Sequence, residues 1–129
     1  MSSQAPSSGQ EAVFDEATAL ARLNGSRALL ERFLRLFRER NSGSVAAIGA
    51  ALAGRDLAAA HQLTHSLIGV AGTVGMIELQ GASRRLEALL LANADAAAAS
   101  AEFSALTLAW TRVALTLAKQ LDEPQGETR

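Results

Sequence analysis

The sequence predicts an all-α protein, an antiparallel up-and-down four-helix bundle with one or two additional short helices. Of its 129 residues, 28 are Ala and 20 are Leu, whereas Val, Ile and Thr together supply 15 and Pro only two. Ala and straight-chain residues lose little conformational freedom in a helix, while β-branched residues lose more. No segment alternates β-branched and polar residues as a strand would. Short connections rich in Gly, Asn, Asp and Ser separate helix-length segments, which makes successive helices antiparallel.

Three helices are expected in the N-terminal half. Asp15 caps a short one that ends near Gly25, since glycine suits the left-handed conformation just beyond a helix end. Ser26 caps a second helix over 26–40, and a third helix of small residues follows over 44–54. The second helix is expected to turn its apolar side toward the core, with the side chains of Leu29, Leu30, Phe33, Leu36 and Phe37.

Three longer helices are expected in the C-terminal half. Asp56 is in a favourable N-cap position for a fourth helix that runs toward Gly75, and a fifth helix covers 76–91. The last break, Asn93-Ala94-Asp95, precedes the final helix. Its apolar residues recur at intervals of three and four, as on one buried face: Phe103, Leu106, Trp110, Val113, Leu117 and Leu121.

Length and charge limit the classes of protein that fit. A domain usually contains about 100–150 residues, so we expect one bundle over 14–121, a disordered N-terminal tail over 1–13 and a flexible C-terminal tail over 122–129. Twelve basic and thirteen acidic side chains give a net charge of −1, which argues against a nucleic-acid partner. Glu31 and Glu39 interrupt the Arg-rich second helix, which indicates a solvated face.

The chain contains no cysteine, so it has no disulfide framework, no thiolate metal site and no cysteine nucleophile. This fits a reducing compartment, and we expect a cytoplasmic location. The longest run of apolar residues and glycines, 45–54, has ten residues, whereas about 18 are needed to cross a bilayer. The first ten residues lack the charged and apolar regions of a secretion signal. We therefore expect no contact with a membrane. We also expect the protein to be a monomer.

The fourth helix carries a histidine that is expected to face water. The predicted core stripe of this helix consists of Leu63, Leu67, Val70 and Val74. His65 lies two residues from both Leu63 and Leu67, and at about 100° per residue it points to the opposite side of the helix. His65 is therefore a candidate for chemistry with another molecule.

Two glycines share the outer face of this helix with His61 and His65. A glycine inside a helix costs about 1 kcal/mol relative to alanine, so Gly69 and Gly72 need a local reason in an Ala-rich chain. Helical side chains lean toward the N-terminus, and a side chain at position 69 would cover His65. We expect Gly69 and Gly72 to give another protein access to the imidazole.

The segment that begins at His65 resembles the signature of the histidine-containing phosphotransfer (HPt) domain. It reads His-Ser-Leu-Ile-Gly-Val-Ala-Gly-Thr-Val-Gly, where the family pattern is roughly His-x-Leu-Lys-Gly-x-Ala-x-x-x-Gly. A later Leu and a Leu-Glu pair also match, as Leu79, Leu86 and Glu87. The likeness extends backward to Phe14-Asp15, Leu20, 30–37 and Gly54-Arg55-Asp56. It covers 14–91 by motif and the last helix by architecture alone.

The resemblance implies an HPt-like helical bundle in a two-component phosphorelay. In such a relay, His65 would accept a phosphoryl group from an aspartyl phosphate in the receiver domain of a hybrid sensor kinase and pass it to the receiver domain of a response regulator. The chain has no Gly-rich phosphate-binding loop, so we expect a phosphocarrier without an ATP site rather than an enzyme. Divalent metal would sit with the partner's carboxylates, and we expect no cofactor on this chain.

One position departs from the family pattern. The family commonly has Lys three residues after the histidine, where this chain has Ile68, and an alkyl side chain cannot offset phosphoryl charge. Either a nearby cation substitutes, with His61, Arg84 and Arg85 as the candidates, or phosphotransfer is slower and more selective. The alternative is a non-transferring HPt-like module that docks to a receiver or kinase through the same face.

A metal site is the other interpretation of His61 and His65, because two histidines at i and i+4 share a helical face and can hold zinc. Gln62 stands where a zinc protease would have its catalytic glutamate, and the chain has no third histidine. We therefore expect no metal site.

Overall fold

The computed structural model describes residues 12–123, and within this range the chain is helical and contains no strand. The elements are α1 (Glu16–Arg22), α2 (Arg27–Asn41), α3 (Ser44–Ala53), α4 (Leu57–Thr73), α5 (Ile77–Leu91), α6 (Ala96–Leu117) and the π-helical turn η2 (Ala118–Asp122). The predicted all-α class and the predicted order of helices are confirmed.

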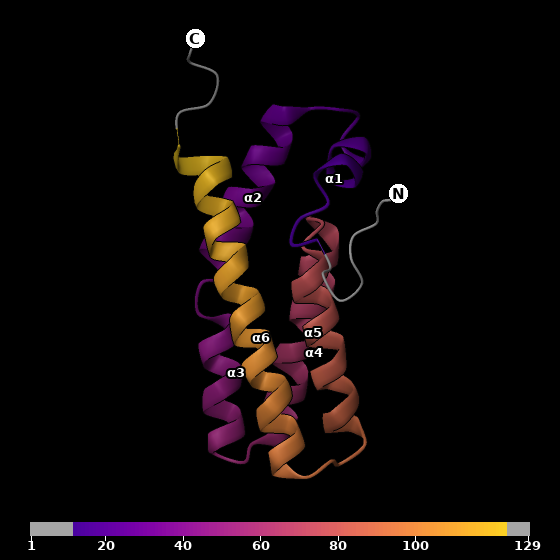
Figure 1. Ribbon diagram of the computed structural model, residues 1–129, viewed down its shortest axis with the longest axis vertical. Helices are drawn as coiled ribbons and strands as arrows, with labels where there is room; N and C mark the ends of the chain where they lie inside the picture. The colour runs from indigo at the N-terminus through magenta and orange to yellow at the C-terminus, as the bar shows by residue number, and fades with distance from the viewer. Residues whose placement is uncertain (1–11, 124–129) are drawn as a thin grey trace, which may run out of the picture.

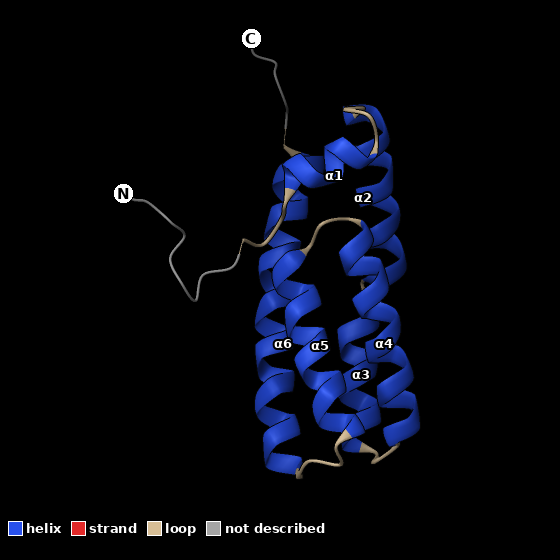
Figure 2. Ribbon diagram, turned by 90° about the vertical axis from the view of Figure 1, so that its right-hand side faces the viewer, coloured by secondary structure: helices blue, strands red, loops and turns tan. Residues whose placement is uncertain are grey.

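The helices form an antiparallel bundle (Figures 1 and 2). The helices α2 and α3 follow one another along the long axis as one broken rod, and α4, α5 and α6 then alternate in direction. The short helix α1 lies at the end of the bundle where α4 gives way to α5, since the Asp15 amide donates to the Gly75 carbonyl at 2.8 Å. The predicted four-helix bundle with additional short helices is therefore confirmed.

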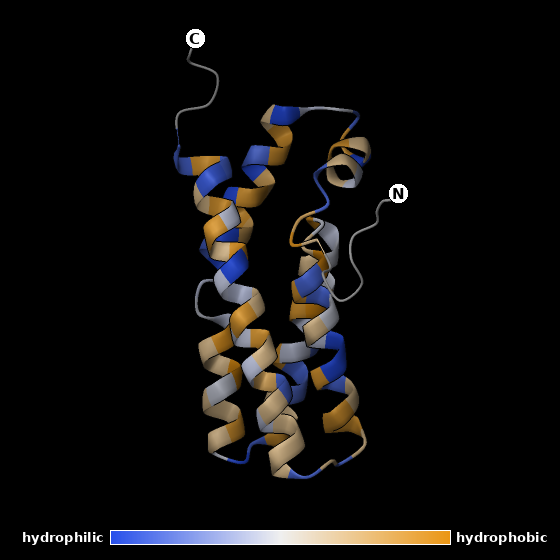
Figure 3. Cartoon of the chain, viewed as in Figure 1, coloured by the Kyte–Doolittle hydropathy of each residue, from blue (hydrophilic) through white to orange (hydrophobic). Residues whose placement is uncertain are grey.

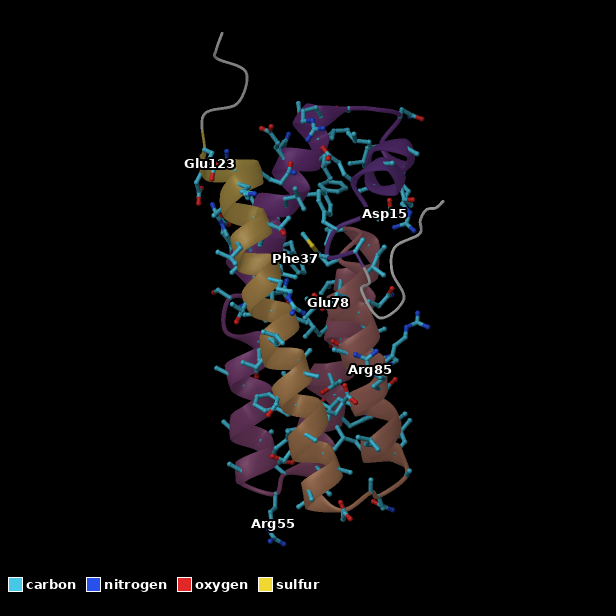
Figure 4. The ribbon with its side chains drawn as sticks, in the orientation of Figure 1. Asp15, Phe37, Arg55, Glu78, Arg85 and Glu123 are labelled. Atoms are coloured by element: carbon cyan, nitrogen blue, oxygen red, sulfur yellow. The ribbon has the colours of Figure 1, made fainter. Side chains whose placement is uncertain are left out.

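Buried side chains from all six α-helices fill the interior, and Figure 3 shows apolar residues recurring along the helices and hydrophilic loops at the lower end. Phe37, labelled in Figure 4, packs against Trp110 of α6 with ring centroids 5.9 Å apart. The predicted stripe on α6 is largely confirmed, because Leu106, Val113, Leu117 and Leu121 are buried. Phe103 and Trp110 are half-buried at its edge.

The predicted inner face of α2 is partly wrong. Leu30 and Phe37 are buried as expected, and so is Leu34, whereas Leu29, Phe33 and Leu36 are 40%, 40% and 43% exposed. The apolar residues of α2 span a wider arc than the bundle interior covers. One flank of that arc therefore remains in contact with water.

The predicted core stripe of α4 is also partly wrong. Leu67 and Val74 are buried, but Leu63 and Val70 are 36% and 37% exposed. The inner face is completed by small residues, Ala60, Thr64 and Ala71. Small side chains let α4 approach its neighbours closely, and the Thr64 hydroxyl is satisfied by donating to the Ala60 carbonyl at 2.7 Å. Hydrophobicity alone favoured the larger leucine and valine for the interior.

The two predicted tails fall mostly on residues 1–11 and 124–129, which lie outside the described residues. Within the described range, Val13 and Phe14 pack half-buried against the core. At the other end Asp122 pairs with Arg38 of α2 at 2.8 Å. None of the helices described here is long and apolar enough to span a bilayer.

Candidate functional site: a surface histidine held by a carboxylate

Local signals place α4, the helix that carries His65. The carboxylate of Asp56 accepts from the amide of Ala59 at 3.1 Å and caps the N-terminus, as predicted. At the other end, Gly75 adopts a φ of +79°, and the Met76 amide donates to the Ala71 carbonyl at 2.9 Å. This hydrogen bond and the left-handed glycine are typical of a Schellman C-cap. The helix boundaries around His65 therefore follow from residues close to them in sequence.

His65 stands on the outer side of α4, as predicted, with 71% of its side chain exposed. Its Nδ1 lies 2.7 Å from Oε2 of Glu87 on α5. An ionised carboxylate only accepts hydrogen bonds, so Nδ1 carries the proton in this contact. The lone pair of neutral His65 is then on Nε2. The site therefore presents an oriented ring nitrogen with an unshared lone pair to the surroundings.

The same carboxylate oxygen also faces His61, one turn earlier on α4. Nε2 of His61 lies 3.1 Å from Oε2 of Glu87, and the two imidazole rings are stacked with centroids 6.0 Å apart and an interplanar angle of 26°. Glu87 is the least exposed of the three side chains, at 18%, against 38% for His61. One carboxylate thus lies between two histidines.

The two outer-face glycines have different structural reasons. A Cβ added to Gly69 would meet no atom within 4 Å, so the outer flank of His65 is open as predicted. A Cβ added to Gly72 would lie 2.2 Å from Nε2 of Gln80, whose side chain crosses from α5 and donates to the Ile68 carbonyl at 3.3 Å. Gly72 therefore makes room for helix packing, rather than for access to His65.

The two arginines expected to compensate for the missing lysine lie on different flanks of α5. Ile68 is half-buried on the side of α4 that faces α5. Arg84 is exposed, four residues after Gln80 and three before Glu87, so it shares their flank of α5. Arg85, labelled in Figure 4, donates from Nε to Glu102 of α6 at 3.0 Å. Arg85 is therefore engaged on the opposite flank.

Two contributors to this site were not recognised as site residues in the sequence. Glu87 matches the motif, but the motif does not predict its hydrogen bond to His65, and no sequence signal points to Gln80. The signal for Glu87 was its place in the Leu-Glu pair, on the helix that follows His65. The groups of His, Asp and Glu in the described part of the chain include none of three or more arranged to hold a metal ion.

Comparison with known proteins identifies the family. The model of the Hpt domain matches residues 32–122, well over half of the chain. The chain belongs to the HPt family. The matched range begins within α2 and includes α6. In the sequence, the likeness of this last helix to the family rests on architecture alone. No match was found to a curated protein or to a solved structure.

Membership in the HPt family establishes the general role of the chain. HPt domains are phosphocarrier modules that take part in histidine phosphotransfer within two-component phosphorelays, where they typically interact with receiver and kinase domains. The resemblance recognised in the sequence is confirmed by this match.

Proposed function

We propose that His65 is the phosphorylated histidine of this HPt protein. It accepts a phosphoryl group from the receiver domain of a hybrid sensor kinase and donates it to the receiver domain of a response regulator. The observation that carries this proposal is the pairing of an exposed imidazole with a carboxylate on Nδ1, 2.7 Å away. This contact leaves Nε2 as the nucleophile on an open face of α4.

The proposed step is an in-line displacement at phosphorus. The Nε2 lone pair of His65 attacks the phosphorus of the aspartyl phosphate, and the bond between phosphorus and the aspartyl oxygen breaks. The receiver recovers its carboxylate, and the imidazole becomes a phosphoimidazolium that retains the Nδ1 proton. Glu87 stabilises the positive charge that develops on the ring, because its Oε2 already accepts from Nδ1. The reverse step returns the phosphoryl group to a second receiver.

An apolar groove between α2 and α4 offers a further contact for a protein partner that docks at His65. A standard interface buries about 800 Å² on each partner, far more than one imidazole, so a receiver that covers His65 also covers its surroundings. Val70 lies on the side of α4 that faces α2, and together with the exposed side chains Phe33 and Leu36 of α2 it lines a groove of about 220 Å³. We propose that the receiver extends over this apolar groove.

Arg84 is the proposed substitute for the family's lysine. It lies on the same flank of α5 as Glu87 and at the level of Ile68, whereas Arg85 is bound to Glu102. Replacing Arg84 with Ala should slow phosphotransfer by about tenfold, the scale of one lost charge-assisted hydrogen bond, and Lys should restore most of the rate. Arg85→Ala is the matched control. Equal rates for Arg84→Ala and the wild type would contradict this assignment.

The chain is proposed to need no cofactor of its own, with divalent metal held by the carboxylates of the partner receiver. We also propose that it acts in the cytoplasm and as a monomer. Metal-free protein should then accept phosphoryl groups as fast as untreated protein when the receiver is supplied with magnesium.

Transfer of radioactive phosphate tests the role of His65. Receiver domains charged with labelled acetyl phosphate are mixed with the wild type, His65→Gln and His65→Ala, and label on this chain is followed by gel. Acid-labile, base-stable label on the wild type and its loss in both variants supports the proposal. Label that persists in both variants removes His65 from the mechanism.

The same experiment decides on the alternative, a docking module that binds a receiver or kinase without accepting phosphate. The replacement of the usual lysine by Ile68 is the observation that favours it. If the wild type binds a receiver, as measured by calorimetry, but neither it nor the variants acquire label, the docking module is established in place of the relay.

A further inference from the structure

His61 has no assigned part in the reaction, yet it contacts the group that orients His65. Its Nε2 lies 3.1 Å from the same Glu87 oxygen that lies 2.7 Å from Nδ1 of His65. The imidazole of His61 is 38% exposed, so its volume is not needed to fill the core. Its contact with Glu87 therefore calls for an explanation other than packing.

We propose that His61 is a positioning residue that holds the Glu87 carboxylate against His65 and so keeps His65 in the tautomer with its lone pair on Nε2. The inference rests on the proposed role of His65. Nε2 of His61 contacts Oε2 of Glu87 at 3.1 Å, and the same oxygen accepts a hydrogen bond from Nδ1 of His65 at 2.7 Å. Two imidazole nitrogens one turn apart on α4 therefore contact the same carboxylate oxygen, and together they restrict where the carboxylate lies.

Glu87 has another charged group close by on its own helix. Arg84 precedes it by three residues, and side chains at that spacing are neighbours on a helix. Without the contact from His61, the carboxylate is free to turn toward the guanidinium and away from His65. A free imidazole favours the tautomer protonated on Nε2, which has no nucleophilic lone pair at that position. His61 thus opposes two changes that would each slow phosphotransfer.

The test uses three variants of position 61. His61→Phe keeps a planar ring but has no N–H group, and His61→Gln supplies an N–H group of similar reach. His61→Ala removes both the ring and the N–H group. The tautomer of His65 is measured by ¹⁵N NMR on the unphosphorylated chain at about pH 8, where an ordinary imidazole is neutral. Transfer rates from a charged receiver are measured in parallel. His61→Phe and His61→Ala should lower the Nδ1–H fraction of His65 and slow transfer about fivefold, and His61→Gln should restore both.

A double-mutant cycle shows whether His61 acts through Glu87. In a Glu87→Ala background, His61→Phe should change neither the tautomer nor the rate any further, because the group that it positions is gone. Additive effects of the two substitutions would overturn the inference, as would a wild-type tautomer and rate in His61→Phe. The far-ultraviolet circular dichroism of each variant verifies its helix content.

Failure of the positioning role and failure of the proposed function give different results. The tautomer measurement needs neither a partner nor phosphate, so it reports on His61 even if another residue accepts the phosphoryl group. Label that persists in His65→Gln overturns the relay through His65. Wild-type tautomers in all three position-61 variants overturn only the role of His61.

Discussion

Filling the open space at Gly69 should raise stability and lower activity at the same time. An added Cβ at this position meets no atom within 4 Å, and the residue lies inside α4. Because glycine is about 0.8–1.0 kcal/mol less favourable than alanine in a helix interior, Gly69→Ala should stabilise the fold by about 0.8 kcal/mol. That gain corresponds to a rise of about 3 °C in the melting temperature. Gly69→Gln should gain somewhat less.

The same substitutions should impede phosphotransfer in order of size. A side chain at position 69 leans toward His65, one turn earlier, and occupies space that the receiver needs. A displacement of about 1 Å between reacting groups reduces a rate by as much as about 10²-fold, so Gly69→Gln should transfer at least about tenfold more slowly. Gly69→Ala should slow phosphotransfer less than Gly69→Gln does.

The assay combines thermal unfolding followed by circular dichroism with transfer rates from a labelled receiver. Ala114→Gln, at an exposed position of α6 away from this face, is the control for added bulk and should transfer at the wild-type rate. The reasoning is refuted if Gly69→Gln transfers as fast as the wild type, or if Gly69→Ala is less stable than the wild type.

Three further predictions concern the fold and the docking surface. Leu67→Ala, at a fully buried position, should lower the free energy of unfolding measured with urea by about 3 kcal/mol, whereas Leu63→Ala should lower it by under about 1 kcal/mol. Equal losses would contradict the observation that α4 buries Leu67 and exposes Leu63. The Arg38 guanidinium beside Asp122 holds the pKa of that carboxyl below its usual value of 3.8, so the pair stabilises above pH 3.8 and its contribution is lost as pH falls through the lowered pKa. Asp122→Asn should therefore be less stable than the wild type at neutral pH, and its stability should fall less steeply as the pH is lowered. Urea midpoints that differ by the same amount at every pH would refute this. Val70→Asp should weaken receiver binding without loss of helix content, and unchanged affinity by calorimetry would exclude the apolar groove from the interface.

The helix boundaries were largely predictable because the signals that set them are local. Asp15, Ser26, Asp56 and Asp95 each cap a helix through an amide three residues ahead. Such a hydrogen bond requires no distant part of the chain. The outward direction of His65 was predictable for the same reason, since it depends only on helical periodicity.

The choice of buried residues was less predictable. On α4 the sequence contrast between Leu63 and Ala60 favours the leucine for the interior, yet Ala60 is fully buried and Leu63 is 36% exposed. Which face a helix buries depends on how closely its neighbours approach. That distance is a property of the packed bundle.

The sequence alone determined the all-α class, the order of the helices, the exposure of His65 and the open flank at Gly69. Only the tertiary structure brought Glu87 to His65 and His61, because the register between two antiparallel helices decides which side chains meet across them. The side chain of Gln80 on α5 occupies the space that a side chain at Gly72 on α4 would need. The same register between α4 and α5 brings the Glu87 carboxylate to both imidazoles. Contacts across 22 residues of chain arise from side-chain packing, which local sequence preferences do not encode.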